Sequence, residues 1–108
     1  MSQEKNRLKQ IVLEGVDEGL LQTLGNSGKE AIYFHLQRMY SLTKEDIPNN
    51  LSVFASGLEK IFGIGAKVIE GAIIESICRK LQIKYEEKKN MRLIDCLQSI
   101  IENPQVTE

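Results

Sequence analysis

The apolar positions of this chain follow a helical repeat of three and four residues over almost its whole length. In the densest run, residues 66–81, four large apolar residues recur every four positions: Ile69, Ile73, Ile77 and Leu81. Three more apolar residues widen this face: Val68, Ile74 and Cys78. The polar residues leave only a narrow solvated strip: Lys67, Glu70, Glu75 and Arg79. A helix that is apolar over most of its girth is usually buried between partners, so the pattern predicts a central helix.

Four other segments show the same periodicity and predict helices at residues 2–24, about 27–42, about 51–62 and about 88–102. Gly25 and Gly63 mark two junctions, because a helix often ends at a glycine in a left-handed turn. Residues 82–87 alternate apolar and polar positions, but one extended piece makes no sheet. The sequence therefore predicts an all-α fold, a single compact domain of about five helices over residues 1–108, with a frayed tail at 103–108.

Length and composition place the chain among globular domains. Its 108 residues suffice for one domain with its own core, and 42% of them are hydrophobic against 27% charged. A net charge of −1 argues against a nucleic-acid footprint over the whole protein. Cys78 and Cys96 fall in apolar helical patterns, which favours buried thiols over a disulfide or a metal pair. No apolar leader follows Met1, so the cytoplasm is the expected location, and a membrane association is not expected.

Gly15 and Gly19 in the first helix require an explanation, because each glycine costs about 1 kcal/mol relative to alanine in a helix interior. One hypothesis is close approach to a second helix across a homodimer interface, since the charged first half of this helix could extend past the domain. The residues of this candidate interface are Leu8, Ile11, Val12, Gly15 and Gly19. Another is a helix that bends near Gly15. A monomer is the alternative to the dimer, with the first helix folded over the last one to cover Leu93, Leu97 and Ile101.

Two glycine-containing turns are candidate anion sites. Residues 25–29 resemble half a phosphate loop, but the spacing is short and Glu30 replaces the metal-binding hydroxyl, which favours a simple turn. Gly63, Gly65 and Lys67 form a better candidate, because free backbone N–H groups at a helix start attract negative charge. A glycine-hinged junction without a ligand explains the same residues and is favoured.

A basic stretch between residues 79 and 92 is a candidate phosphate-binding patch. Its six basic residues are offset only by Glu86 and Glu87: Arg79, Lys80, Lys84, Lys88, Lys89 and Arg92. A solvated connection between helices has the same composition, and the end of a helix favours cations such as Arg79 and Lys80. This plainer interpretation is favoured.

The sequence contains no recognisable catalytic or metal-binding set. His35 is the only histidine, and one histidine does not make a zinc site. The periodicity of the second helix places it near the predicted inward face, which consists of Ala31, Ile32, Leu36 and Met39. A partly buried structural histidine is therefore expected, and neither an enzyme nor a bound cofactor is predicted.

Four motifs between Leu13 and Leu81 resemble the Nitrosopumilus output domain family, a group of small, mainly archaeal helical domains. They are Glu14–Leu20 (EGVDEGL), Gly25–Tyr33 (GNSGKEAIY), Glu45–Pro48 (EDIP) and Phe62–Glu70 (FGIGAKVIE). The resemblance covers about two-thirds of the chain. It implies a helical fold and a role in the response to signals, without a defined reaction.

Together these patterns predict a non-enzymatic regulatory, signal-output or protein-interaction domain that acts as a homodimer. Two alternatives stay open. One is a nucleic-acid-binding regulator that uses residues 79–92, which is possible but not favoured. The other is a small-molecule sensor with a binding site beside the central helix.

Overall fold

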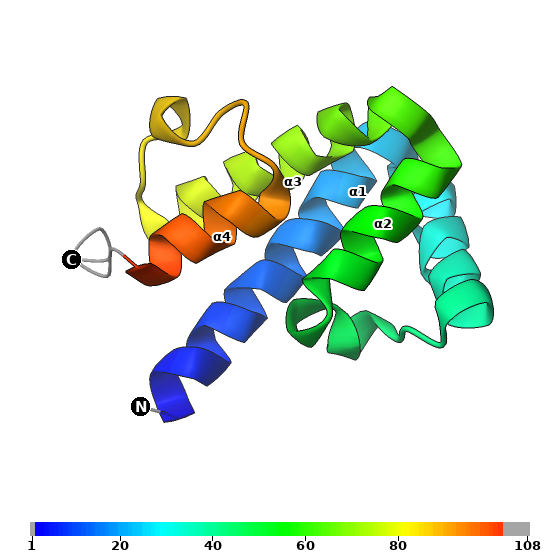
Figure 1. Cartoon of the computed structure of the whole chain (residues 1–108), viewed down its shortest axis with the longest axis horizontal. Helices are drawn as coiled ribbons and strands as arrows, with labels where there is room; N and C mark the ends of the chain where they lie inside the picture. The colour runs from blue at the N-terminus through cyan, green and yellow to red at the C-terminus, as the bar shows by residue number, and fades with distance from the viewer. Residues whose placement is uncertain (1, 103–108) are drawn as a thin grey trace.

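The computed structural model describes residues 2–102, with the side chains of residues 6–102. This part of the chain forms four α-helices: α1 (Ser2–Tyr40), α2 (Leu51–Phe62), α3 (Ala66–Leu81) and α4 (Leu93–Glu102). A short 3-10 turn lies between each helix and the next: η1 (Lys44–Asn49), η2 (Gly63–Gly65) and η3 (Tyr85–Glu87). No strand occurs between residues 2 and 102, which confirms the all-α prediction (Figure 1). The predicted frayed tail lies outside the described residues.

The helices predicted for residues 2–24 and 27–42 form one element, α1, which bends at Gly25. Gly25 has a φ of 77° and a ψ of 175°, a backbone conformation that residues with a side chain rarely adopt. Beyond the bend, the later part of α1 turns back beside α2 (Figure 1). The described chain therefore has four α-helices rather than about five, because the glycine redirects α1 and the helix resumes at once.

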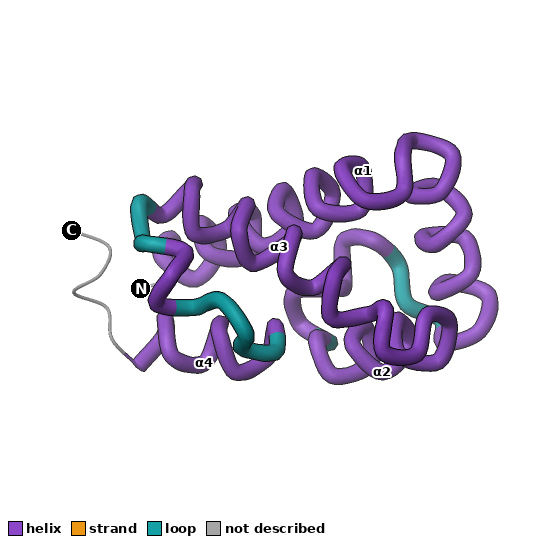
Figure 2. Tube along the Cα trace, turned by 90° about the horizontal axis from the view of Figure 1, so that it is seen from above, coloured by secondary structure: helices purple, strands orange, loops and turns teal. Residues whose placement is uncertain are grey.

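α3 contacts each of the other three helices, and Figure 2 shows α1 on one side of it and α2 and α4 on the other. Ile69, Ile73 and Ile77 are buried, as the periodicity predicted. Two positions contradict the predicted pattern, since Val68 is 69% exposed and Glu70 is only 1% exposed. The burial of Glu70 is possible because hydrogen-bond donors from the start of α4 satisfy its carboxylate.

The part of α1 after the bend faces α2 with a different side from the predicted one. Of the four residues expected to face inward, two are buried and two exposed: Ile32 and Leu36, against Ala31 and Met39. His35 is also exposed, so the prediction of a partly buried structural histidine is wrong. Gly57 of α2 decides the contact, because a Cβ there would lie 2.7 Å from Leu36 Cδ2 and 3.2 Å from Tyr40 Cε2. The Leu36–Tyr40 side of α1 is drawn inward as a result.

α4 begins at Leu93 rather than near residue 88. The backbone N–H of Leu93 donates to the Glu70 carboxylate at 3.0 Å, so a side chain from α3 satisfies one of the free N–H groups at this helix start. Cys78 of α3 and Cys96 of α4 are both free and buried, which confirms the prediction of buried thiols. Burial raises the pKa of both thiols, that of Cys96 to about 11. Within residues 2–102, the helices are too short or too polar to cross a bilayer.

Candidate interaction surface

α1 and α3 approach each other closely through two glycines. A Cβ added to Gly15 would lie 2.5 Å from Ile77 Cγ1. A Cβ added to Gly19 would lie 2.5 Å from Ile73 Cγ1 and 2.8 Å from the Ile73 backbone nitrogen. Neither position has room for a side chain. The glycines thus allow close helix packing, and the packing lies within one chain.

This packing buries most of the predicted dimer interface. Every residue of that interface contacts α3 or packs on the chain's own core: Leu8, Ile11, Val12, Gly15 and Gly19. Ile11 is 9% exposed and Val12 is 3% exposed, so a second copy cannot reach them while the fold is intact. The prediction that these residues form a dimer interface is therefore wrong, because the apolar stripe has partners within the chain. Of the three residues that the folded-back monomer was expected to cover, Leu93 and Leu97 are buried and Ile101 is 63% exposed. Homodimer formation itself stays a prediction.

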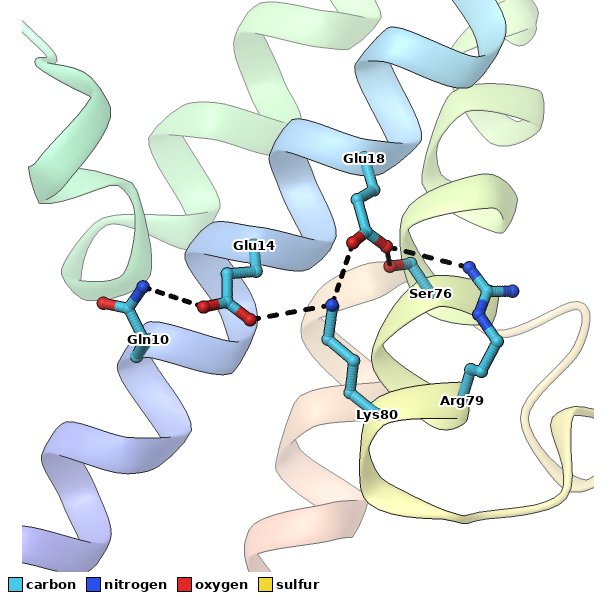
Figure 3. A network of polar contacts seen from close by, with 6 residues as sticks. All are labelled: Gln10, Glu14, Glu18, Ser76, Arg79 and Lys80. Carbon is cyan, nitrogen blue, oxygen red and sulfur yellow. Dashed lines mark hydrogen bonds and ion pairs between the residues drawn. The ribbon is translucent and has the colours of Figure 1, made fainter.

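A polar seam runs along the α1–α3 contact (Figure 3). Its residues are Gln10, Glu14, Glu18, Ser76, Arg79 and Lys80. Glu18 accepts a hydrogen bond from the Ser76 hydroxyl and another, 2.9 Å long, from Lys80 Nζ. The same ammonium group lies 3.6 Å from Glu14, and Arg79 lies 3.7 Å from Glu18. The seam therefore fixes how α1 is placed along α3.

The contacts of the seam stabilise the ionised forms of Glu18 and Lys80. Hydrogen bonds from Ser76 and Lys80 lower the pKa of Glu18, and Glu18 in turn raises the pKa of Lys80. Ser76 is completely buried and its hydroxyl donates a hydrogen bond to Glu18, so the hydroxyl is out of reach of a substrate. These contacts are those of a structural ion-pair network.

A second network ties the two parts of α1 together across the bend. Asp17, before the bend, accepts hydrogen bonds from Tyr33 at 2.9 Å and from Lys29 at 3.1 Å, both after it. Lys44 of η1 lies 3.3 Å from the same carboxylate. Burial opposes the ionisation of Asp17, but these donors outweigh it and lower the pKa of Asp17. Because Lys29 is engaged in this way, residues 25–29 are a helix bend at Gly25 and the helical turn after it, held by an ion pair.

A third network joins α2, α3 and the start of α4. Arg92 Nε and Nη2 each donate to a Glu70 oxygen at 2.9 Å, while Nη1 reaches Glu59 of α2 at 3.0 Å. The hydrogen bond with Glu70 raises the pKa of Arg92 further. Sequence reasoning missed this pair, because the helical pattern places Glu70 on the solvated strip. The only local signal was an arginine immediately before an apolar helix start.

The basic stretch is divided among separate internal contacts. Four of its six cations have partners within the chain: Arg79, Lys80, Lys88 and Arg92. Lys88 is itself buried, with Nζ 2.8 Å from the Ser99 hydroxyl. Lys84 and Lys89 are exposed and form no ion pair with a described side chain. The six residues therefore do not form the single basic patch that the sequence suggested.

The candidate anion site of Gly63, Gly65 and Lys67 lies in the turn between α2 and α3. A hollow of about 350 Å³ opens beside this turn, with Lys67, Ile64 and Glu59 among its lining residues. Lys67 is exposed and could meet an anion, and Glu59 on the same wall pairs with Arg92 at 3.0 Å. Gly63 is explained by its backbone alone, because its φ of 60° favours glycine.

Exposed aliphatic side chains gather around the same turn. Ile64 is 91% exposed, Val68 is 69% exposed, and Ile61 adds to them at the end of α2. Ile64 of η2 and Val68 of α3 are four residues apart, and η2 leads directly into α3, so the two lie about one helical turn from each other. Two exposed lysines are their neighbours in the sequence, Lys60 before Ile61 and Lys67 before Val68. We call these residues the apolar corner: Lys60, Ile61, Ile64, Lys67 and Val68.

Four other large apolar residues of the described chain are exposed on other helices or helix segments: Leu21, Phe34, Met39 and Ile101. The Phe34 ring already has the Arg38 guanidinium 5.7 Å from its centroid. Met39 lies five positions after Phe34 and therefore points to a different side of α1. Isolated exposed apolar residues are normal on protein surfaces, whereas adjoining ones mark interaction sites. The apolar corner is therefore the best candidate site.

A second hollow, of about 310 Å³, lies between α2, α3 and α4. The Glu70–Arg92 pair lines it, together with Ser52 and Ser56 of α2. Its volume is at the lower end of the range for small-molecule sites, and it lies beside α3, where the sequence placed a possible sensor site. Among the described residues, no three His, Cys, Asp or Glu side chains are grouped to hold a metal ion.

No family model, curated protein or solved structure matches this chain. The candidate site therefore rests on the geometry of the chain itself. Sequence reasoning placed Gly63, Gly65 and Lys67 at this turn for their possible anion contacts. It assigned Val68 to the core and did not single out Ile64, because periodicity does not tell which side of an apolar helix remains uncovered.

Proposed function

We propose that this protein is a non-enzymatic interaction domain with a regulatory role, and that the apolar corner is its docking surface. The exposure of Ile64 beside Val68 carries the proposal. The turn geometry accounts for Gly63, but Ile64 is 91% exposed and contributes almost no buried surface to the fold. An isoleucine in this position favours unwanted association unless a partner covers it. Docking gives the side chain a role that folding does not.

The three polar networks support a binding role. Asp17, Glu18 and Glu70 are each held by cations of the same chain. They join α1 to α3, close the bend in α1, and tie α2 and α3 to the start of α4. A surface carried on helices fixed in this way is preorganised, so little conformational freedom is lost on binding.

Photocrosslinking tests this proposal. Benzoylphenylalanine would replace Ile64, Val68 or, as the control, the exposed Gln22 of α1. In extracts of the source organism, positions 64 and 68 should give the same discrete adduct, and position 22 should not. Excess unlabelled wild-type protein should compete the adduct away, whereas an Ile64→Ser variant should not. Equal adducts at all three positions would show that the corner has no docking role.

A small-molecule sensor is a second candidate, favoured by the hollow between α2, α3 and α4. A ligand there would contact residues of α2 and the Glu70–Arg92 pair at once, so its binding would raise the melting temperature. A thermal-shift screen with polar metabolites tests this function. A Ser56→Leu variant, which fills the hollow, should abolish any shift seen with the wild type, and a shift that survives the substitution would place the ligand elsewhere.

The remaining functional predictions have less support. A nucleic-acid-binding regulator would need the basic stretch, most of whose cations are engaged internally. The resemblance to the Nitrosopumilus output domain family supports a regulatory role as a proposal. Its motifs include Asp17, Glu18 and Glu70, the acceptors of the three networks. The homodimer and the cytoplasmic location stay predictions from the sequence.

A further inference from the structure

The charges of the apolar corner restrict what can bind there. Lys60 and Lys67 are exposed, and neither forms an ion pair with a described side chain. Of the two acidic residues close by in the sequence, Glu59 pairs with Arg92 at 3.0 Å and Glu70 is buried in the same network. The corner therefore combines exposed aliphatic side chains with two lysines that form no ion pair with a described side chain.

The shape of the corner adds a second restriction. The hollow of about 350 Å³ is lined by Glu59, Ile64, Ala66 and Lys67, and Gly63 contributes no side chain to fill it. A hollow beside exposed aliphatic groups accepts a projecting apolar side chain. A helix that presents such side chains every three or four residues could place one in the hollow and another against Val68.

Resting on the proposed function, we propose that the apolar corner binds an acidic amphipathic helix of another protein. The apolar face of that helix packs on Ile64 and Val68, and its flanking aspartates or glutamates pair with Lys60 and Lys67. The aliphatic contacts supply the affinity, and the lysines select the partner, because like charges facing each other across an interface are unfavourable.

The same charges disfavour a second copy of this chain at the corner. A two-fold interface brings each surface patch against itself. Lys60 and Lys67 would then face the same lysines of the other copy, while Glu59 and Glu70 already share Arg92 as a partner. A partner with the opposite charge pattern fits better.

Two designed helical peptides test the inference directly. They share one leucine face, which glutamates flank in the first peptide and lysines flank in the second, and each carries fluorescein. Anisotropy titrations at about 0.1 M salt should show the acidic peptide binding about tenfold more tightly, the difference expected from two exposed ion pairs. The difference should shrink at about 1 M salt, where exposed charges are screened.

Charge-reversal variants locate the effect. Lys60→Glu/Lys67→Glu should reverse the peptide preference. The matched control is Lys84→Glu/Lys89→Glu, which alters two exposed lysines elsewhere and should leave the preference unchanged. Ile64→Ser/Val68→Ser should abolish binding of both peptides, and circular dichroism should confirm that each variant is folded.

Other results would overturn the inference. These are equal binding of the two peptides, binding of neither, binding to phosphatidylcholine–phosphatidylglycerol vesicles in place of the peptides, or self-association lost in Ile64→Ser. The proposed function has its own readout, since a specific crosslink from position 64 together with no charge preference would retain the interaction role and reject only this partner chemistry.

Discussion

Arg92 holds Glu70 with two hydrogen bonds of 2.9 Å, across a separation of 22 residues in the sequence. The Glu70 side chain is 2% exposed and that of Arg92 is 36% exposed, so the pair places a buried carboxylate under a guanidinium that reaches solvent. Leu93 adds its backbone N–H to the same carboxylate. One acidic side chain on α3 thereby fixes where α4 begins and how it meets α3.

Replacing this carboxylate should destabilise the fold markedly. Glu70→Gln keeps the shape but removes the charge that Arg92 binds, so we expect a loss of about 2–4 kcal/mol in the free energy of unfolding. Urea denaturation measures it. The control is Glu59→Gln, which removes the exposed partner of the same arginine and should cost less than about 1 kcal/mol. Equal losses in the two variants would contradict the assignment of Glu70 as the main partner.

Because α1 and α3 pack so closely, adding a single methyl group at Gly19 should destabilise the fold. Gly19→Ala would place its Cβ 2.5 Å from Ile73 Cγ1 and 2.8 Å from the Ile73 nitrogen, so α1 and α3 must separate. We expect a destabilisation of about 1–3 kcal/mol, despite the better helix propensity of alanine. Gly71→Ala is the matched control, because its Cβ would meet only the Tyr85 hydroxyl at 3.7 Å. That variant should be unchanged or more stable by up to about 1 kcal/mol.

The stability of the fold should decrease in acid. Asp17 and Glu18 have folded-state pKa values below their ordinary values of 3.8 and 4.5. Such groups stabilise the folded state above their unfolded pKa, and the contribution is lost as the pH falls through the folded pKa. The free energy of unfolding should therefore be steady from about pH 7 to 6 and fall below about pH 5. Urea titrations of Asp17→Asn/Glu18→Gln should show a shallower fall, and a slope identical to that of the wild type would refute the role of these two carboxylates.

A buried and an exposed isoleucine should differ greatly in how much stability is lost on substitution by alanine. Ile73→Ala removes a completely buried side chain and should cost about 2–5 kcal/mol. Ile64→Ala alters a side chain that is 91% exposed and should change stability by less than about 0.5 kcal/mol. Thermal and urea unfolding measure both. A large loss at Ile64 would mean that the residue supports the fold, and the case for a docking surface would fail.

The predicted homodimer can be tested apart from its rejected interface. Val12 is 3% exposed within the chain, so Val12→Ala should destabilise the fold by about 1–3 kcal/mol and leave the molar mass unchanged. Light scattering over a range of concentrations measures the mass. Should the wild type be a dimer that Val12→Ala separates into folded monomers, the intramolecular packing of α1 would be contradicted.

The sequence predicted the helical segments well, because helix periodicity is a local property. Residues 51–62 and 66–81 match α2 and α3, and Ile69, Ile73 and Ile77 are buried as their spacing indicated. The start of α4 was missed, because it depends on Glu70 of another helix. The inward face of α1 after Gly25 was missed too, because Gly57 of α2 selects it.

By itself, the sequence determined the all-α fold, the positions of the glycine junctions and the buried state of Cys78 and Cys96, since these follow from residue type and spacing along the chain. Tertiary structure alone decided which polar residues are buried and which apolar ones remain exposed. Glu70 and Val68 lie two positions apart on α3, yet the charged residue is buried and the apolar one is exposed. Burying Glu70 requires Arg92 from the α4 side, and exposing Val68 requires that no helix cover that side of α3. Both conditions depend on contacts between distant segments, which local periodicity does not encode.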